Sequence, residues 1–149
     1  MARRVAGACL LLLSIAGCGG SSVGEGAEVS VYVSEPLCTE AKEELSRKGS
    51  DVNGVEVRAV CLSDAEKPGG SLDLASAGAD ARRATEDSTT VAFVEPPGRE
   101  ASFTRPILDE AEIALIVSRS GSEAMARVLD ALDSRGGEES PREAVREGP

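Results

Sequence analysis

Two uninterrupted apolar segments lie close together in the second half of the chain. Val91–Val94 and Ile113–Val117 each lack the alternation with polar residues that a strand with one solvated face would have. Each segment therefore predicts a strand covered on both faces, as in a parallel α/β sheet. Between them, Phe103, Ile107 and Ala111 recur at helical spacing and predict a helix packed through this stripe. Such a helix is the crossover that two parallel strands require.

The first half of the chain shows the same succession of strand and helix. Glu28–Ser34 predicts the first strand, and Pro36 suits the first turn of the helix that follows. Val55–Leu62 predicts the second strand, and its partial alternation of apolar and polar residues indicates a position at or near a sheet edge. The other expected elements are a surface loop over Asp64–Ser71, a helix over Leu72–Asp87 and a last helix after the capping box Ser120-x-x-Glu123.

These elements predict an α/β fold, a three-layer open parallel sheet of four strands with helices on both faces. Right-handed crossovers give the strand order 2-1-3-4. We expect this domain to span residues 28–135. Residues 136–149 lack apolar periodicity and are expected to form a disordered tail.

The amino terminus predicts a lipoprotein signal. Arg3 and Arg4 precede an apolar region, Val5–Ile15, which is shorter than the roughly 20 residues of a membrane-spanning helix. Ile15-Ala16-Gly17-Cys18 then resembles a bacterial lipobox. This implies a signal peptide over 1–17, lipidation of Cys18, a flexible tether over 18–27 and an extracytoplasmic protein anchored in the cell membrane. The alternative is an ordinary secretory signal cleaved nearby.

Charge and composition narrow the classes of function. The formal net charge of −10 argues against a nucleic-acid partner, because phosphate binding needs a concentrated basic face. The absence of histidine removes the commonest general base and most zinc and iron sites. Glu95, directly after the first apolar segment, is expected to be a solvated acid. We therefore expect no enzyme activity, no cofactor and no metal site.

Two cysteines remain in the expected domain. Cys38 follows the first predicted strand and Cys61 ends the second, so both belong to the carboxyl edge of the sheet, where a disulfide is geometrically reasonable. The outer side of a membrane is oxidising enough to keep such a bridge. The alternative is a free, reactive or metal-binding pair, and no second cysteine motif or histidine completes such a site.

The best candidate for a ligand site is the serine-rich loop over Ser118–Ser122. Its hydroxyls, on Ser118, Ser120 and Ser122, stand with the backbone N–H of Gly121 at a helix amino terminus and suit a carboxylate or another anion. Ser102, near the start of the preceding helix, is expected to face the same crevice. The alternative is that these hydroxyls only cap helices.

The chain resembles the amino-terminal lobe of type I periplasmic-binding proteins, in particular branched-chain amino-acid substrate-binding lipoproteins of ABC transporters. The resemblance covers the lipobox, the strand region VSVYVSEPL, the second strand GVEVRAVCLSD, and the segments ADARRATEDSTTVAFVEPP and RPILDEAEIALIVSRSGS. In the family, hydroxyls and backbone N–H groups of the loops after the third and fourth strands hold the amino-acid carboxylate. This implies ligand contacts from Ser102, Ser118, Ser120, Gly121 and Ser122.

The chain also departs from the family pattern. The loop after the third strand reads EPPGREAS, which is bulkier and more charged than the small loop expected there. Family members have a second lobe that closes over the ligand, and the resemblance here covers only one lobe. Half a cleft cannot bury most of a small ligand, so we expect weak affinity unless a partner supplies the other wall.

Two hypotheses of function follow. In the first, a membrane-anchored solute-binding-like lipoprotein assists amino-acid import, binds a small amino acid weakly and works with an ABC permease, a second lobe-bearing protein or a copy of itself. In the second, a structural or interaction lipoprotein keeps the lobe fold without binding a ligand.

Overall fold

A computed structural model describes residues 26–62, 66–67, 71–98, 100–135 and 139–148. The predicted signal peptide, Cys18 and residues 18–25 of the tether lie outside the described residues. The described elements are β1 (Ala27–Val33), α1 (Glu35–Lys48), β2 (Asp51–Val52), β3 (Val55–Cys61), β4 (Glu66–Lys67), β5 (Ser71–Leu72), α2 (Leu74–Glu86), β6 (Thr90–Glu95), α3 (Glu100–Glu110), β7 (Ala114–Val117), α4 (Gly121–Arg135) and α5 (Pro141–Arg146).

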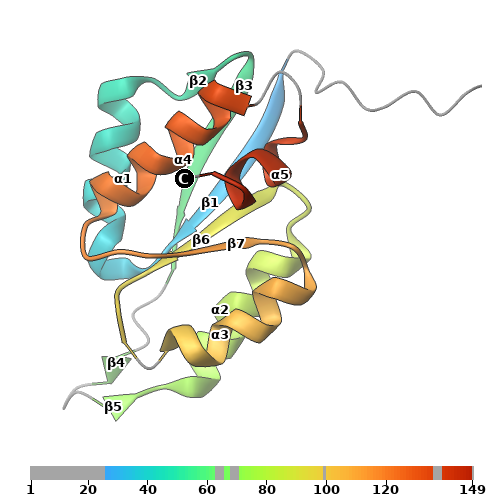
Figure 1. The fold of residues 1–149 in the computed structure, drawn as a ribbon. Coiled ribbons are helices and arrows are strands. Elements are labelled where there is room, and N and C mark those ends of the chain that lie inside the picture. Colours follow the sequence, from blue (N-terminus) through green and yellow to red (C-terminus); the bar gives the residue numbers. More distant parts are fainter. Residues whose placement is uncertain (1–25, 63–65, 68–70, 99, 136–138, 149) are drawn as a thin grey trace, which may run out of the picture.

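The main sheet has the strand order β2-β3-β1-β6-β7 (Figure 1). β3, β1, β6 and β7 are parallel to their neighbours, so the predicted order of the four parallel strands is confirmed. β2 adds a short antiparallel strand beside β3, through a turn in which Asn53 and Gly54 both have positive φ. This turn geometry suits an Asn-Gly pair, because both residues tolerate the left-handed region.

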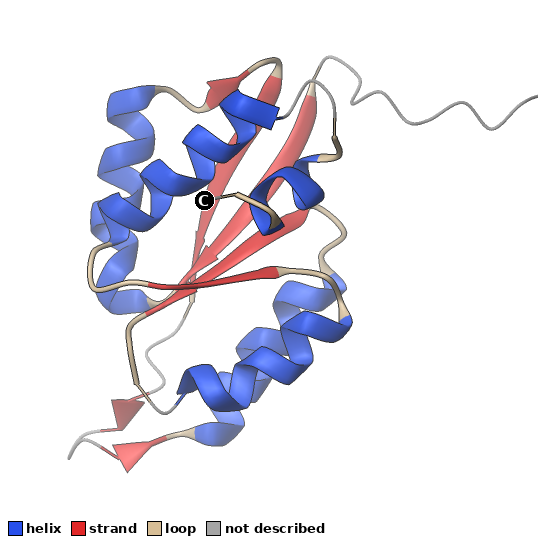
Figure 2. Ribbon diagram, viewed as in Figure 1, coloured by secondary structure: helices blue, strands red, loops and turns tan. Residues whose placement is uncertain are grey.

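Helices cover both faces of this sheet, as predicted (Figure 2). On one face, α1, α4 and α5 enclose the larger core, to which β1 contributes Val29, Val31 and Val33. On the other face, α2 and α3 enclose a smaller core that includes Tyr32 and Phe93. Successive strand residues thus serve opposite cores, as the two-residue period of a strand requires.

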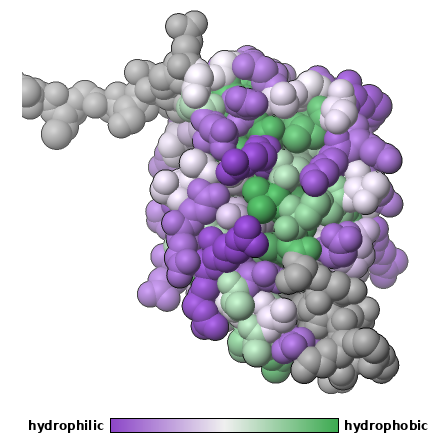
Figure 3. All heavy atoms as spheres, turned by 180° about the vertical axis from the view of Figure 1, so that it is seen from behind, coloured by the Kyte–Doolittle hydropathy of each residue, from purple (hydrophilic) through white to green (hydrophobic). Residues whose placement is uncertain are grey.

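The two apolar segments differ in how completely they are covered. All residues of β6 are buried, as predicted. β7 is less covered, because it is the last strand of the sheet; Ala114, Leu115 and Ile116 are half-buried and Val117 is exposed. At the other end of the sheet, β3 leaves Ala59–Cys61 half-buried. Figure 3 shows the molecule from the side opposite to Figure 1. In the middle of this face hydrophobic residues gather, and hydrophilic residues border them. Both ends of the sheet therefore leave apolar side chains partly accessible.

The buried stripe of α3 is displaced by one residue from the prediction. Thr104 and Leu108 are fully buried, whereas Phe103 is 40% exposed. Phe103 packs against α2 instead, where a Cβ on Gly78 would lie 3.0 Å from its ring. The sequence allowed both registers, because Ile107 and Leu108 are adjacent and either can begin an apolar stripe.

Within the expected loop over Asp64–Ser71, β4 and β5 form a separate two-stranded sheet. A disulfide joins Cys38 in α1 to Cys61 at the end of β3, with a Cα–Cα distance of 5.6 Å. The predicted bridge is thus confirmed. Among the described residues, no helix has the length and apolar character needed to cross a bilayer.

The expectation of a disordered tail over 136–149 is wrong for α5. Ser140 and Glu143 form a reciprocal capping box, and Ala144 and Val145 are buried against the domain. Arg142 donates hydrogen bonds from Nε to the Thr90 carbonyl, from Nη1 to that of Ala111 and from Nη2 to that of Ser88. The helix has too few apolar residues to show a period, so only its capping box was visible in the sequence.

We expect Arg142→Leu to lower the free energy of unfolding by about 2 kcal/mol, because the carbonyls that Arg142 binds lose a charged donor. Arg146→Leu is the matched control on the same helix. Within the described part of the chain, the polar partner of Arg146 is Glu112, in an exposed ion pair whose loss should cost less than about 1 kcal/mol. Urea unfolding of the two variants measures both values, and equal losses would contradict this role for Arg142.

Candidate functional site

The serine-rich loop connects the end of β7 to the start of α4 and is folded around its own hydroxyls. Ser118 is buried, and its O–H donates to the Ser120 carbonyl at 3.0 Å while its oxygen accepts from the Ser120 N–H at 3.2 Å. The Ser118 N–H donates to the Glu95 carbonyl, which fixes the loop to β6. Ser118 is therefore committed to the loop itself.

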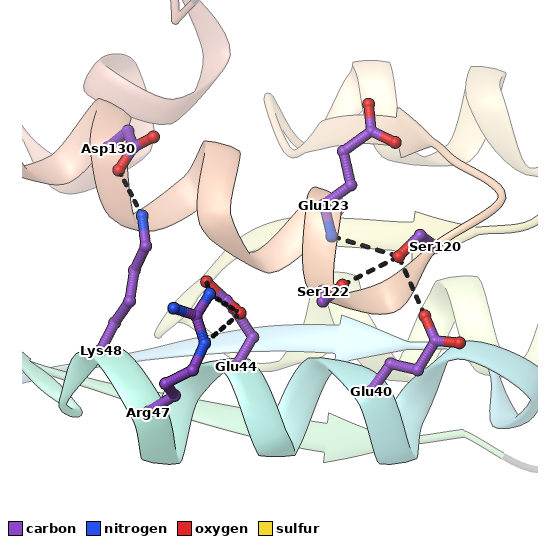
Figure 4. A network of polar contacts seen from close by, with 8 residues as sticks. All are labelled: Glu40, Glu44, Arg47, Lys48, Ser120, Ser122, Glu123 and Asp130. Atoms are coloured by element: carbon purple, nitrogen blue, oxygen red, sulfur yellow. Dashed lines mark hydrogen bonds and ion pairs between the residues drawn. The ribbon is translucent and has the colours of Figure 1, made fainter.

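A carboxylate from α1 already occupies the donors expected to hold an anion (Figure 4). Oε2 of Glu40 accepts from the Ser120 hydroxyl at 2.9 Å and from the Gly121 N–H at 2.9 Å. The Ser122 hydroxyl lies 3.0 Å from that of Ser120, and the Glu123 N–H donates to the Ser120 hydroxyl at 3.4 Å. The carboxylate at these donors thus belongs to the protein itself.

Gly121 lets the two helices come close enough for this contact. A Cβ on Gly121 would lie 1.9 Å from the carbonyl oxygen of Leu37 and 2.9 Å from the amide nitrogen of Ala41. Any side chain would therefore collide with the backbone of α1, which cannot yield as a flexible side chain can. The glycine that the resemblance implied as a ligand contact thus serves the close packing of α1 on α4.

Ser102 is not brought to this contact. It is exposed on α3, which packs with α2 over one face of the sheet, whereas Glu40 belongs to α1 on the other face (Figure 2). The five predicted ligand residues are consequently divided. Ser118, Ser120, Gly121 and Ser122 form one loop, and Ser102 belongs to a different layer.

The sequence did not reveal Glu40 as the partner of the loop. Glu40 is 80 residues from Ser120 in the chain, and only the packing of α1 against α4 brings them together. A hollow of about 190 Å³ beside the contact is lined by Glu40, Glu43, Glu44, Arg47 and Ser122. With three carboxylates against one guanidinium, which itself pairs with Glu44, this hollow disfavours a free anion.

Glu95 is buried, contrary to the expectation of a solvated acid. It is 2% exposed, and the Thr104 hydroxyl lies 3.1 Å from each of its carboxylate oxygens. Its position in β6, which is buried along its whole length, explains the difference. A buried carboxylate needs such partners, so Thr104 is buried with it on α3.

A second polar cluster lies where α2 ends and β6 begins. Asp87 accepts hydrogen bonds from the hydroxyl and the N–H of Thr89 and from the Tyr32 hydroxyl. The hydrogen bonds from Thr89 hold the pKa of the Asp87 carboxyl below its usual value, against the effect of burial. Burial, together with the bond to Asp87, raises the pKa of Tyr32. The cluster ties the end of α2 to β1, and this role is structural.

No group of three or more metal-ligating acidic or cysteine side chains occurs among residues that the structure describes. No protein-family model matches the chain, and a comparison with curated proteins finds no match.

We expect Gly121→Ala to lower the free energy of unfolding by about 3 kcal/mol, because the new methyl group overlaps the backbone of α1. Gly78→Ala is the matched control: the same substitution in another helix, where the added methyl meets the side chains of Phe103 and Arg82 and no backbone atom. Its effect should be small, since alanine also favours the helix. Thermal or urea unfolding measures both, and a tolerated Gly121→Ala would contradict the close contact.

The low pKa of Asp87 predicts a loss of stability in acid. A carboxyl whose pKa is lower in the folded than in the unfolded state stabilises the fold above the unfolded value of about 3.9, and this stability is lost as the pH falls through the folded value. In Asp87→Asn, the free energy of unfolding should therefore fall less steeply than in the wild type as the pH is lowered into the acid range. Asp130→Asn, at an exposed ion pair with Lys48, is the control and should leave that slope in place. An unchanged slope in Asp87→Asn would contradict the assignment.

Proposed function

We propose that this protein is a membrane-anchored, extracytoplasmic interaction protein that keeps the lobe fold of a solute-binding protein without binding a solute at the serine-rich loop. The observation that supports this proposal is the position of Glu40, whose carboxylate takes the Ser120 hydroxyl and the Gly121 N–H. A ligand carboxylate would need these same donors. The sequence pattern at Cys18 supports the membrane anchor.

The serine-rich loop resembles an anion-binding site in which the Glu40 carboxylate takes the place of the anion. A helix amino terminus and nearby hydroxyls attract negative charge, and an internal carboxylate competes well for them because it is tethered at high effective concentration. A free amino acid must displace Glu40 and then lie beside Glu43 and Glu44. Both steps oppose the binding of an anion.

A second candidate function is weak binding of an amino acid in support of ABC import. Glu40 is exposed, so its carboxylate can leave the loop without exposing apolar surface. The binding contacts would then be Ser120, Gly121 and Ser122, while Ser118 holds the loop in shape. A permease, a second lobe-bearing protein or another copy of the chain would have to cover the ligand.

Calorimetry on the full chain, with leucine, isoleucine and valine as probes, distinguishes the two. We expect no heat of binding with the wild type. Glu40→Ala vacates the donors, and we expect it to bind the probes with a dissociation constant of about 1 mM, near the affinity that a few hydrogen bonds to one carboxylate provide. Glu43→Ala is the matched control, because it removes a neighbouring acid that does not hydrogen-bond to the loop. We expect this variant to give no heat of binding.

Two results would overturn the main proposal. Millimolar or tighter binding by the wild type, lost in Ser120→Ala/Ser122→Ala, would favour the solute-binding function. A folded Glu40→Ala variant that gives no more heat of binding than Glu43→Ala would show that Glu40 does not occupy an anion site.

A further inference from the structure

The outer edge of β7 offers main-chain groups to a further strand. Among the described strands, none lies beyond β7 in the sheet. The Ser118 N–H bonds to the Glu95 carbonyl, so even-numbered residues of β7 direct their N–H and C=O groups toward β6. The odd-numbered residues, Leu115 and Val117, consequently direct theirs outward.

This edge lacks two of the usual protections against pairing, charged residues and proline. Ala114–Val117 contains no charged residue and no proline. The opposite edge differs, because β2 pairs with the start of β3 and Arg58 places a charge within that strand. Of the two ends of the sheet, β7 is the one open along its whole length.

A groove of about 450 Å³ runs along β7 and is lined by residues of α3 on one side and of α4 and α5 on the other. Arg105 lines it from α3, Arg127 from α4 and Arg146 from α5, against two acids, Asp109 and Glu112. The whole chain has a net charge of −10, so two copies repel each other over most of their surface. Because this groove carries charges of both signs, two copies of it can approach each other with less repulsion than the acidic surface elsewhere would cause.

We propose that the protein forms a two-fold symmetric dimer in which β7 pairs antiparallel with β7 of a second copy, with Ile116 on the symmetry axis. In this register Leu115 lies opposite the partner's Val117, and both outward-facing residues of each strand form hydrogen-bonded pairs. The two copies then share one continuous sheet through an interface that closes on itself.

The flanking charges fit the same symmetry. The groove carries a row of three charges: Arg105 in the middle of α3, Asp109 near its end and Glu112 in the turn after it. Two antiparallel copies of this row place Arg105 near the partner's Glu112 on both sides of the axis. Because the paired strands run in opposite directions, the two carboxyl edges point away from each other. Only Ser118, opposite the partner's Ala114, reaches the paired strands, so the Glu40 contact lies beyond them and the dimer is independent of the proposed function.

The register predicts a specific cross-link. Ile116 and the partner's Ile116 form a pair without direct hydrogen bonds, in which Cβ atoms are about 5 Å apart, close enough for a disulfide after small adjustments. Ile116→Cys in the full chain, oxidised mildly in membranes or mild detergent, should give a dimer band on a non-reducing gel. Ser46→Cys, exposed on α1, is the control for random collision, and the wild type controls for the native cysteines.

Val117→Pro tests the hydrogen bonds separately. It removes an outward N–H but no bond to β6, and proline suits an edge strand. The loss of two bonds between copies should weaken dimerisation about thirtyfold, measured by analytical ultracentrifugation of the full chain in detergent, with an unchanged melting temperature. Arg105→Glu should also weaken the dimer, and Arg105→Glu/Glu112→Arg should restore it.

Three results would overturn the proposal. One is a wild-type chain that stays monomeric while Ile116→Cys cross-links no more than Ser46→Cys. Another is a cross-link in Ile116→Cys that persists undiminished when Val117→Pro is added. The last is a monomeric chain whose β7 edge is protected from hydrogen exchange by an added acidic peptide, which would assign the groove to a different partner.

Discussion

The close contact between α1 and α4 determines the chemistry of the carboxyl edge. Gly121 brings the start of α4 against the backbone of α1, and this approach puts the Glu40 carboxylate within hydrogen-bond distance of the loop. The same two helices are joined farther along by Lys48 and Asp130 at 2.8 Å (Figure 4). A glycine at one position therefore decides whether the loop presents its donors to solvent or to the protein.

Much of the fold could be predicted, because its signals are local. The apolar run Val91–Val94 and the crossover helix after it specify a buried parallel strand, and chirality then limits the strand order. The disulfide between Cys38 and Cys61 followed from that order. The short helix α5 did not, because it is fixed by Arg142 binding carbonyls that are distant in sequence. Local periodicity contains no information about such contacts.

The candidate site shows the same division. The serine-rich loop was found because hydroxyls at a helix amino terminus are visible in the sequence. Its occupant, Glu40, was not found, because acidic residues are common on α1 and only the tertiary contact singles one out. Glu95 shows the reverse error: a charged residue at the end of an apolar strand looked solvated, and Thr104 on the following helix allows it to be buried.

Some hydrogen-bonding groups of this protein are satisfied within the fold, and others are left available to a partner. The Glu40 carboxylate on α1 accepts hydrogen bonds from the serine-rich loop. The loop therefore contributes to the packing of α1 on α4 and has less capacity for an external anion. The outward groups of Leu115 and Val117 are different, since they are main-chain donors and acceptors at the end of a sheet, and another extended backbone satisfies them best. A resemblance to solute-binding lobes draws attention to the carboxyl edge. The main-chain groups still available for binding lie instead at the side of the sheet, along β7.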